Sequence, residues 1–176
     1  MKRFTLVSLL IVALVLSVAL PAMAQRGDDA NRKSKNGKVE GTIDGVKVTV
    51  EYGRPKVNKR KILGGLVPFD KLWRTGANEA TTITFSKDVT VEGKKVAAGT
   101  YSLFTIPMKD KWMVLVNKVA KQWGGSKYDN ANDVAAVDVK PGKGALVEEM
   151  TFKIDGSNVV LLWDTFTVAV KVAASK

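Results

Sequence analysis

The sequence contains no cysteine and no histidine among its 176 residues. Without cysteine the chain forms no disulfides, so its stability must come from packing. Without histidine it has neither Ser-His-Asp catalysis nor the imidazole ligands of common zinc sites. It also lacks a glycine-rich phosphate loop and a G-x-S-x-G nucleophile motif. We therefore predict no metal and no cofactor, and any chemistry must proceed without imidazole.

Long apolar runs are absent after the first 24 residues, which have the features of a secretory signal peptide. Lys2 and Arg3 precede an apolar run over 6–20, and residues 21–24 end in an Ala-x-Ala cleavage site before Gln25. This run is shorter than the roughly 20 residues of a membrane-spanning helix. We therefore predict a signal peptide over 1–24 and an exported protein, periplasmic or extracellular, that does not span the membrane.

Acidic residues are the minority, with 17 Asp/Glu against 28 Lys/Arg and a formal net charge of +11. The excess is concentrated in residues 25–61, which hold eleven basic and five acidic residues. We predict no nucleic-acid partner for an exported protein, and an anionic envelope polymer or lipid headgroup is the expected electrostatic partner. Residues 25–37 are polar and without periodicity, and we interpret them as a flexible basic leader, in the simplest case a solvated tail.

Helical periodicity is scarcely visible, and short segments instead alternate apolar and polar residues. Residues 46–52 place valine or tyrosine at every second position, and 112–118 (WMVLVNK) are almost continuously apolar, as in a central strand. Turn sequences rich in glycine recur about every ten residues. This pattern predicts an all-β (mainly β) single domain over 38–176, an antiparallel β-sandwich or barrel-like fold of eight or nine strands.

The segment WRTGANEATTITF (73–85) gathers an aromatic, a guanidinium, an amide and a carboxylate just before a strand pattern. Arg74 offers a planar fork for carboxylate or phosphate, and Asn78 and Glu79 offer groups that hydrogen-bond a ligand. With Trp73 as an apolar wall, these residues predict a small-molecule site. The alternative is structural: Arg74 pairs with Glu79 across a corner, and Asn78 closes the turn. The spacing leaves both interpretations open.

A second candidate is the loop that carries Trp123 and Tyr128. Gly124 and Gly125 follow Trp123 directly, so one face of the indole is expected to stay accessible and to suit stacking against a sugar ring. The competing interpretation is that Trp123 belongs to the core, as tryptophan in β-sandwiches often does.

Several motifs are spread along the chain: YxRP at 52–55, GGLVP at 64–68, WRTGANEAT at 73–81, AGTY at 98–101, FTIP at 104–107 and QWG at 122–124. Together they closely resemble a bacterial family of exported proteins known as a domain of unknown function, DUF family 2911. The resemblance runs from about Val46 to the C-terminal strand, with a departure at Pro68-Phe69-Asp70, where such proteins often read Pro-Tyr-Gly. It implies a bacterial envelope or extracellular setting and a mainly β domain. It implies no established activity and no catalytic residues.

Three hypotheses about function follow. The leading one is a non-enzymatic exported protein that binds a small ligand, glycan or envelope component through six residues: Trp73, Arg74, Asn78, Glu79, Trp123 and Tyr128. The first alternative is a hydrolase that uses Glu79 as general base and Arg74 to stabilise an anion. The second alternative is a purely structural envelope protein.

Overall fold

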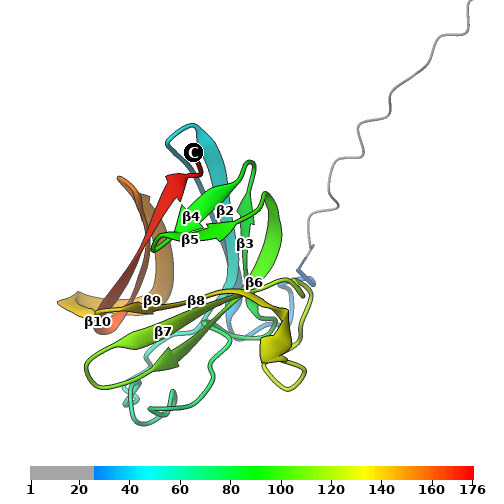
Figure 1. Cartoon of the computed structure of the whole chain (residues 1–176). Helices are drawn as coiled ribbons and strands as arrows, with labels where there is room; N and C mark the ends of the chain where they lie inside the picture. The colour runs from blue at the N-terminus through cyan, green and yellow to red at the C-terminus, as the bar shows by residue number, and fades with distance from the viewer. Residues whose placement is uncertain (1–25) are drawn as a thin grey trace, which may run out of the picture.

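Ten β-strands form two antiparallel sheets in the computed structural model, which describes residues 26–176 (Figure 1). The two sheets form a sandwich, so the prediction of a mainly β, antiparallel fold is confirmed. The described residues contain ten strands rather than eight or nine. The sequence interpretation omitted the edge strand β1 (Lys35–Ile43) and the short strand β5 (Lys94–Val96). The predicted signal peptide lies outside the described residues.

The larger sheet has six strands in the order β1-β2-β3-β6-β7-β8, and all neighbouring strands are antiparallel. After β1 its members are β2 (Val46–Arg54), β3 (Thr81–Phe85), β6 (Gly99–Pro107), β7 (Trp112–Asn117) and β8 (Asp133–Val139). A two-residue turn joins β1 to β2, with φ of 49° at Asp44 and 74° at Gly45. Two successive left-handed residues are typical of hairpin turns that match the strand twist.

The smaller sheet has four strands in the order β5-β4-β10-β9. Its members are β4 (Val89–Val91), β5 (Lys94–Val96), β9 (Gly142–Asp155) and β10 (Asn158–Ala174). The pairing of β9 with β10 shifts register between Leu162 and Phe166, where Asp164 adopts a φ of 50°. Such an irregularity bends a strand and redirects its side chains. It divides the long strand β10 just after the buried Trp163.

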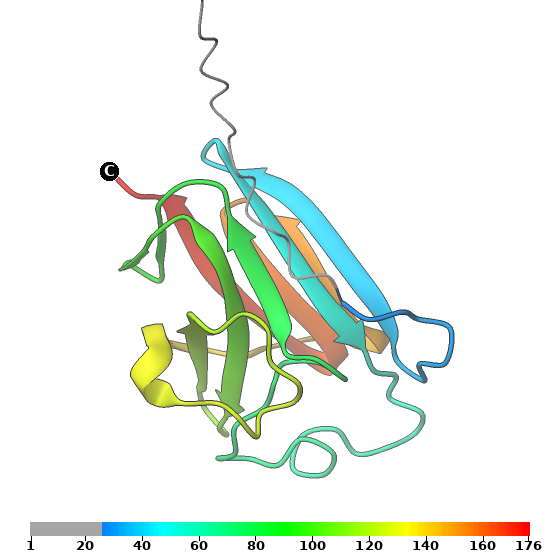
Figure 2. The same ribbon diagram turned by 90° about the vertical axis from the view of Figure 1, so that its right-hand side faces the viewer.

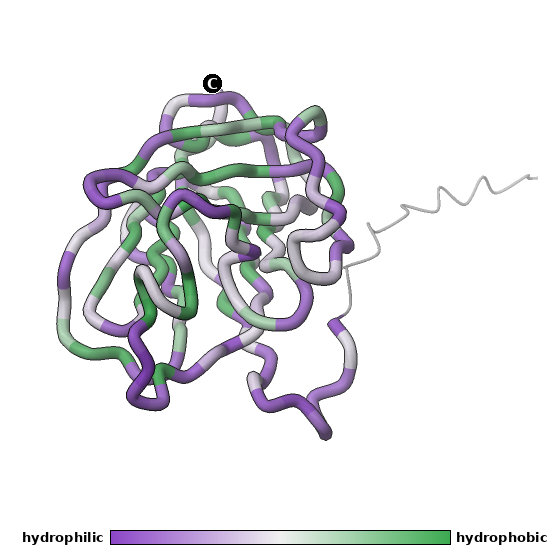
Figure 3. Tube along the Cα trace, turned by 90° about the horizontal axis from the view of Figure 1, so that it is seen from below, coloured by the Kyte–Doolittle hydropathy of each residue, from purple (hydrophilic) through white to green (hydrophobic). Residues whose placement is uncertain are grey.

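Apolar side chains at every second strand position fill the space between the two sheets, and Figure 3 shows the alternation of hydrophobic and hydrophilic residues along the trace. Ile83 and Phe85 of β3 are buried, at 4% and 1% exposure, as expected for alternate residues on the core face of a strand. Trp112 and Trp163 are also buried in the core. The core therefore follows directly from the period-two pattern of the sequence.

Two long connections lie outside the sheets and carry all the candidate site residues (Figure 2). The first, residues 55–80, joins β2 to β3, and the second, residues 118–132, joins β7 to β8. The second ends in a single 3-10 turn, η1 (Asn130–Asn132), and packs on a small apolar cluster around Phe104 and Leu115. No helix within residues 26–176 has the length and apolar character needed to cross a bilayer.

Candidate functional site

Residues 73–80 form a corner that is hydrogen-bonded to two strands of the larger sheet. The Trp73 N–H donates to the Thr105 carbonyl over 2.7 Å, and the Thr105 N–H donates back to the Trp73 carbonyl over 2.9 Å. The Ala77 N–H donates to the carbonyl of Gly53 on β2. Left-handed backbone at Thr75 and Asn78, with φ of 54° and 63°, turns the chain between these contacts. These hydrogen bonds therefore hold the corner in place at the residues that directly precede β3.

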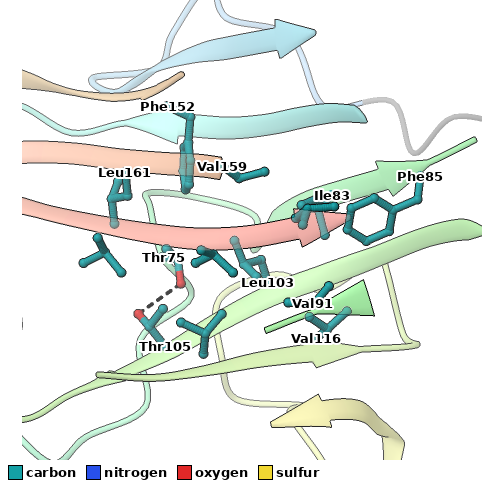
Figure 4. A pocket seen from close by; sticks show the side chains of 14 residues that line it. Thr75, Ile83, Phe85, Val91, Leu103, Thr105, Val116, Phe152, Val159 and Leu161 are labelled. Atoms are coloured by element: carbon teal, nitrogen blue, oxygen red, sulfur yellow. Dashed lines mark hydrogen bonds between the residues drawn. The ribbon is translucent and has the colours of Figure 1, made fainter. Parts of the chain in front are cut away.

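Thr75 anchors the corner inside the core, as Figure 4 shows. Its hydroxyl lies 3.1 Å from that of Thr105, and both line an interior void of about 20 Å³ whose other walls are apolar. That volume holds about one water molecule. The interior of the sandwich is therefore too small to bind a ligand, and the candidate site must lie outside it.

Glu79 binds two arginines that precede β1, and not Arg74. Arg32 Nη2 donates to Glu79 Oε1 over 2.6 Å, Arg26 Nη2 lies 3.4 Å from Glu79 Oε2, and the Gly27 N–H donates to the same carboxylate. The hydrogen bonds from Arg32 lower the pKa of Glu79 to about 2, although partial burial acts in the opposite direction. The Arg74–Glu79 pair of the structural interpretation is wrong, and the carboxylate is held in its ionised form.

Residues 26–34, named here the N-terminal segment, dock on the corner. The Arg26 side chain is only 6% exposed. Its guanidinium donates to four backbone carbonyl oxygens, those of Glu51, Ala77, Glu79 and Ala80. Asn78 Nδ2 donates to the Ser34 carbonyl over 3.0 Å, so Asn78 and Glu79 both hold this segment. The sequence interpretation treated these residues as a flexible leader, whereas in the structure they dock on the corner. Local sequence did not reveal this docking because the partners of Arg26 lie far along the chain.

Arg74 lines a different space, named here the Arg74 cavity, of about 270 Å³. Arg60, Ser34, Trp73 and Trp163 also line it. Burial lowers the pKa of Arg74, and no neighbouring charge opposes this shift. Within residues 26–176, Arg74 Nε is buried without a hydrogen-bond partner, as is Trp163 Nε1. The cavity thus contains an unpaired cation and no acidic side chain among its lining residues.

Trp73 forms the aromatic wall of the Arg74 cavity. Its ring stacks on Trp163, with centroids 5.8 Å apart and planes 22° from parallel, and meets Trp112 edge-on at 6.2 Å. These contacts fix the indole orientation while leaving the side chain partly exposed. Of the four corner residues predicted as a site, the structure brings Trp73 and Arg74 to one cavity, while Asn78 and Glu79 serve the N-terminal segment.

Trp123 lines a second space, named here the Trp123 cavity, of about 240 Å³. It is 66% exposed, so the competing interpretation of a core tryptophan is wrong. Glu79, Thr82 and Gln122 line the same cavity. Trp123 therefore lies on the Glu79 side of the corner and does not line the cavity of Arg74.

Tyr128 lines neither of these two cavities. Its ring packs edge-on against Phe104 at 4.9 Å, and its hydroxyl donates to Asp133. Burial and the Asp133 carboxylate raise the pKa of Tyr128. Its contacts hold the 118–132 loop against the sheet. Within residues 26–176 no group of three acidic side chains is placed to hold a metal ion.

Sequence reasoning missed Arg60, Ser34 and Trp163 in the Arg74 cavity and Thr82 and Gln122 in the Trp123 cavity. Trp163 lies in an apolar strand pattern, which accounts for its burial but does not indicate its place at a cavity wall. Gln122 directly precedes Trp123 in the QWG motif, so that motif was the available signal for it. Arg60 lies in a run of basic residues, and no local pattern separates it from its neighbours.

Comparison with known proteins places the chain in a family. No curated protein and no solved structure matches it. One family model matches residues 34–172, a range that includes the corner and both cavity-bearing loops. This chain belongs to the family described as "Protein of unknown function (DUF2911)".

Proposed function

We propose that this protein is exported to the bacterial envelope or beyond and binds a small anionic ligand with an apolar part in the Arg74 cavity. The observation that carries the proposal is the Arg74 guanidinium, which is partly buried and unpaired among the described residues 26–176. A cation removed from water without a partner is unfavourable. A carboxylate or phosphate that enters the cavity and accepts two parallel hydrogen bonds from Arg74 would offset that cost.

The other lining residues support this ligand class. Arg60 adds a second positive charge, although its guanidinium also donates to the Val57 and Lys56 carbonyls. Trp73 offers a fixed aromatic surface for the apolar part of the ligand. A volume of about 270 Å³ is close to the smallest ligand pockets, roughly 300 Å³. The ligand is therefore expected to be a compact organic acid or phosphate rather than a polymer.

Binding without chemistry is favoured over hydrolysis. A general base works best with a pKa near the working pH, whereas hydrogen bonds from Arg32 lower the pKa of Glu79 to about 2. Two arginines also occupy its carboxylate. Arg74 lines a separate cavity, so it is not placed to stabilise an anion that Glu79 would generate. The open cavity also gives ligand binding more support than a purely structural role.

Thermal-shift titration of the mature protein tests this proposal. The probes are inorganic phosphate, citrate, benzoate and phenyl phosphate, which separate anionic charge from aromatic content. Arg74→Met removes the charge and retains an apolar side chain. We expect the variant to be at least as stable as the parent, because it no longer holds a partly buried guanidinium whose Nε has no partner among residues 26–176. We expect it to lose ligand-dependent stabilisation.

Lys95→Met is the matched control, because it removes one positive charge at an exposed hairpin position outside both cavities. It should keep the full ligand response. Loss of the response in both variants would show that only net charge matters. Unfolding of Arg74→Met, or an unchanged ligand response in it, would contradict the proposal and favour a structural role for Arg74.

A further inference from the structure

We propose that the Trp123 cavity is a second, independent site, which binds a sugar ring of an uncharged or weakly charged glycan. The proposal does not rest on the Arg74 cavity. It rests on three features of the Trp123 cavity: an exposed indole on a hydrogen-bonded backbone, a buried amide oxygen without a partner in the described part of the chain, and an arginine and a glutamate that pair with each other. Together these features match a ring that has one apolar face and several hydroxyl groups.

The backbone around Trp123 is fixed by pairing with the corner. The Ala80 N–H donates to the Gln122 carbonyl over 2.9 Å, and the Gly124 N–H donates to the Asn78 carbonyl over 3.2 Å. Glu79 and Trp123 are directly opposite in this antiparallel bridge, so their side chains lie on the same side. Trp123 is nevertheless 66% exposed. An indole that is this exposed on a hydrogen-bonded backbone offers an aromatic surface for stacking.

The polar lining of this cavity is incompletely hydrogen-bonded. Thr82 is 4% exposed and lines the cavity. Gln122 is 6% exposed. Its Nε2 donates to the Val119 carbonyl over 2.8 Å, which fixes the amide orientation, and its Oε1 has no partner in the described part of the chain. Since buried polar groups are normally satisfied, this lining is suited to a ligand that both donates and accepts hydrogen bonds.

The charges in the cavity favour a neutral ligand. Arg26 and Glu79 both line the cavity, but they bind each other, and Arg32 also binds Glu79. Lys121 is the remaining charged lining residue, and it is exposed. The volume of about 240 Å³ is below that of typical drug-sized pockets. It fits one ring of a longer chain whose neighbouring rings extend into solvent.

Isothermal titration calorimetry on the mature protein tests the proposal with chitotetraose, cellotetraose, maltotetraose and mannotetraose. A pull-down with insoluble peptidoglycan serves as the polymeric probe. We expect at least one of these glycans to bind. We expect Trp123→Ala to weaken that binding at least about tenfold, and Trp123→Phe to restore part of it, because a smaller aromatic face remains. Thr82→Val, which keeps the side-chain shape, should weaken binding severalfold without loss of structure.

The control is Arg74→Met, which should leave glycan binding unchanged because Arg74 does not line this cavity. The glycan test and the small-anion test can therefore fail separately. Absence of binding to every glycan would overturn the proposal, as would equal binding by Trp123→Ala and the parent. Self-association that disappears in Trp123→Ala, without glycan binding, would assign the indole to a protein contact and would also overturn it.

Discussion

The substitution Glu79→Gln tests whether one carboxylate holds the N-terminal segment on the sandwich. Gln has nearly the same size as Glu but no charge, so it removes the attraction to Arg26 and Arg32 without opening a cavity. The side chains of Glu79, Arg26 and Arg32 are 23%, 6% and 14% exposed. After substitution, Arg26 would remain buried with carbonyl partners but no counter-ion, which is unfavourable. We expect both the global stability and the docking of the segment to fall.

The pKa of Glu79 determines how large the stability loss in Glu79→Gln should be and how it should depend on pH. A fall from 4.5 to about 2 corresponds to at most about 3 kcal/mol of folding free energy. Solvent near Arg32 screens part of this interaction, so we expect a loss of about 1–2 kcal/mol at neutral pH. Because the folded-state pKa is below the unfolded one, the contribution is complete above pH 4.5 and disappears as the pH falls toward 2.

Urea denaturation of the parent and Glu79→Gln at pH 7 and at pH 3 measures this contribution. The stability difference should be largest at pH 7 and smaller at pH 3. Trypsin digestion followed by mass spectrometry reports the segment itself, and cleavage after Arg32 and Lys33 should be faster in the variant. Glu40→Gln is the control, because Glu40 pairs with Lys38 and Lys47 at 39% exposure. It should change the stability much less than Glu79→Gln does, because solvent screens an exposed ion pair.

Two results would refute this reasoning. The first is a Glu79→Gln protein with parental stability at pH 7 and an unchanged cleavage rate, because it would show that the carbonyl contacts of Arg26 suffice. The second is a stability difference that grows at low pH, because it would mean that the ionised carboxylate is not the stabilising form.

Two further predictions concern the supports of the two loops. A methyl group at Gly53 would lie 2.2 Å from the Ala77 carbonyl oxygen, so Gly53→Ala should cost more than about 2 kcal/mol by forcing the corner away from β2. Gly156→Ala is the control, because Gly156 lies at a turn with open space and a φ of 55°, and it should cost about 1 kcal/mol. Thermal denaturation of both variants measures the difference. Tyr128→Phe removes the hydrogen bond to Asp133 and should cost about 1 kcal/mol. Because burial raises the pKa of Tyr128, spectrophotometric titration of this variant should lack one phenol that ionises late in the parent. Equal titration curves for the two proteins would contradict the raised pKa of Tyr128.

The fold was largely predictable because burial between two sheets imposes a period of two on the sequence. Val46, Val48 and Val50 lie on the core face, as that period requires. β1 was missed for a physical reason. It is an edge strand with mostly exposed or half-buried residues and two glycines, so it depends on pairing with β2 rather than on a buried face of its own. Local sequence carries little signal for such a strand.

The candidate site was predictable in composition but not in arrangement. The sequence indicated Arg74 and Trp73 as anchor and wall, and both line one cavity. It offered Arg74 as a partner for Glu79 because the two are neighbours in sequence. The observed partners, Arg32 and Arg26, are 47 and 53 positions away. Contacts over such separations are set by tertiary packing, and no local spacing encodes them.

The position of Arg26 also has a consequence for the order of folding. The carbonyls that it contacts on Glu51 and Ala80 are 25 and 54 positions along the chain, and they belong to β2 and to the corner that precedes β3. Closing so long a loop is entropically costly until those elements have formed. The first described residues of the chain are therefore expected to dock last, as a late kinetic phase that follows assembly of the two sheets.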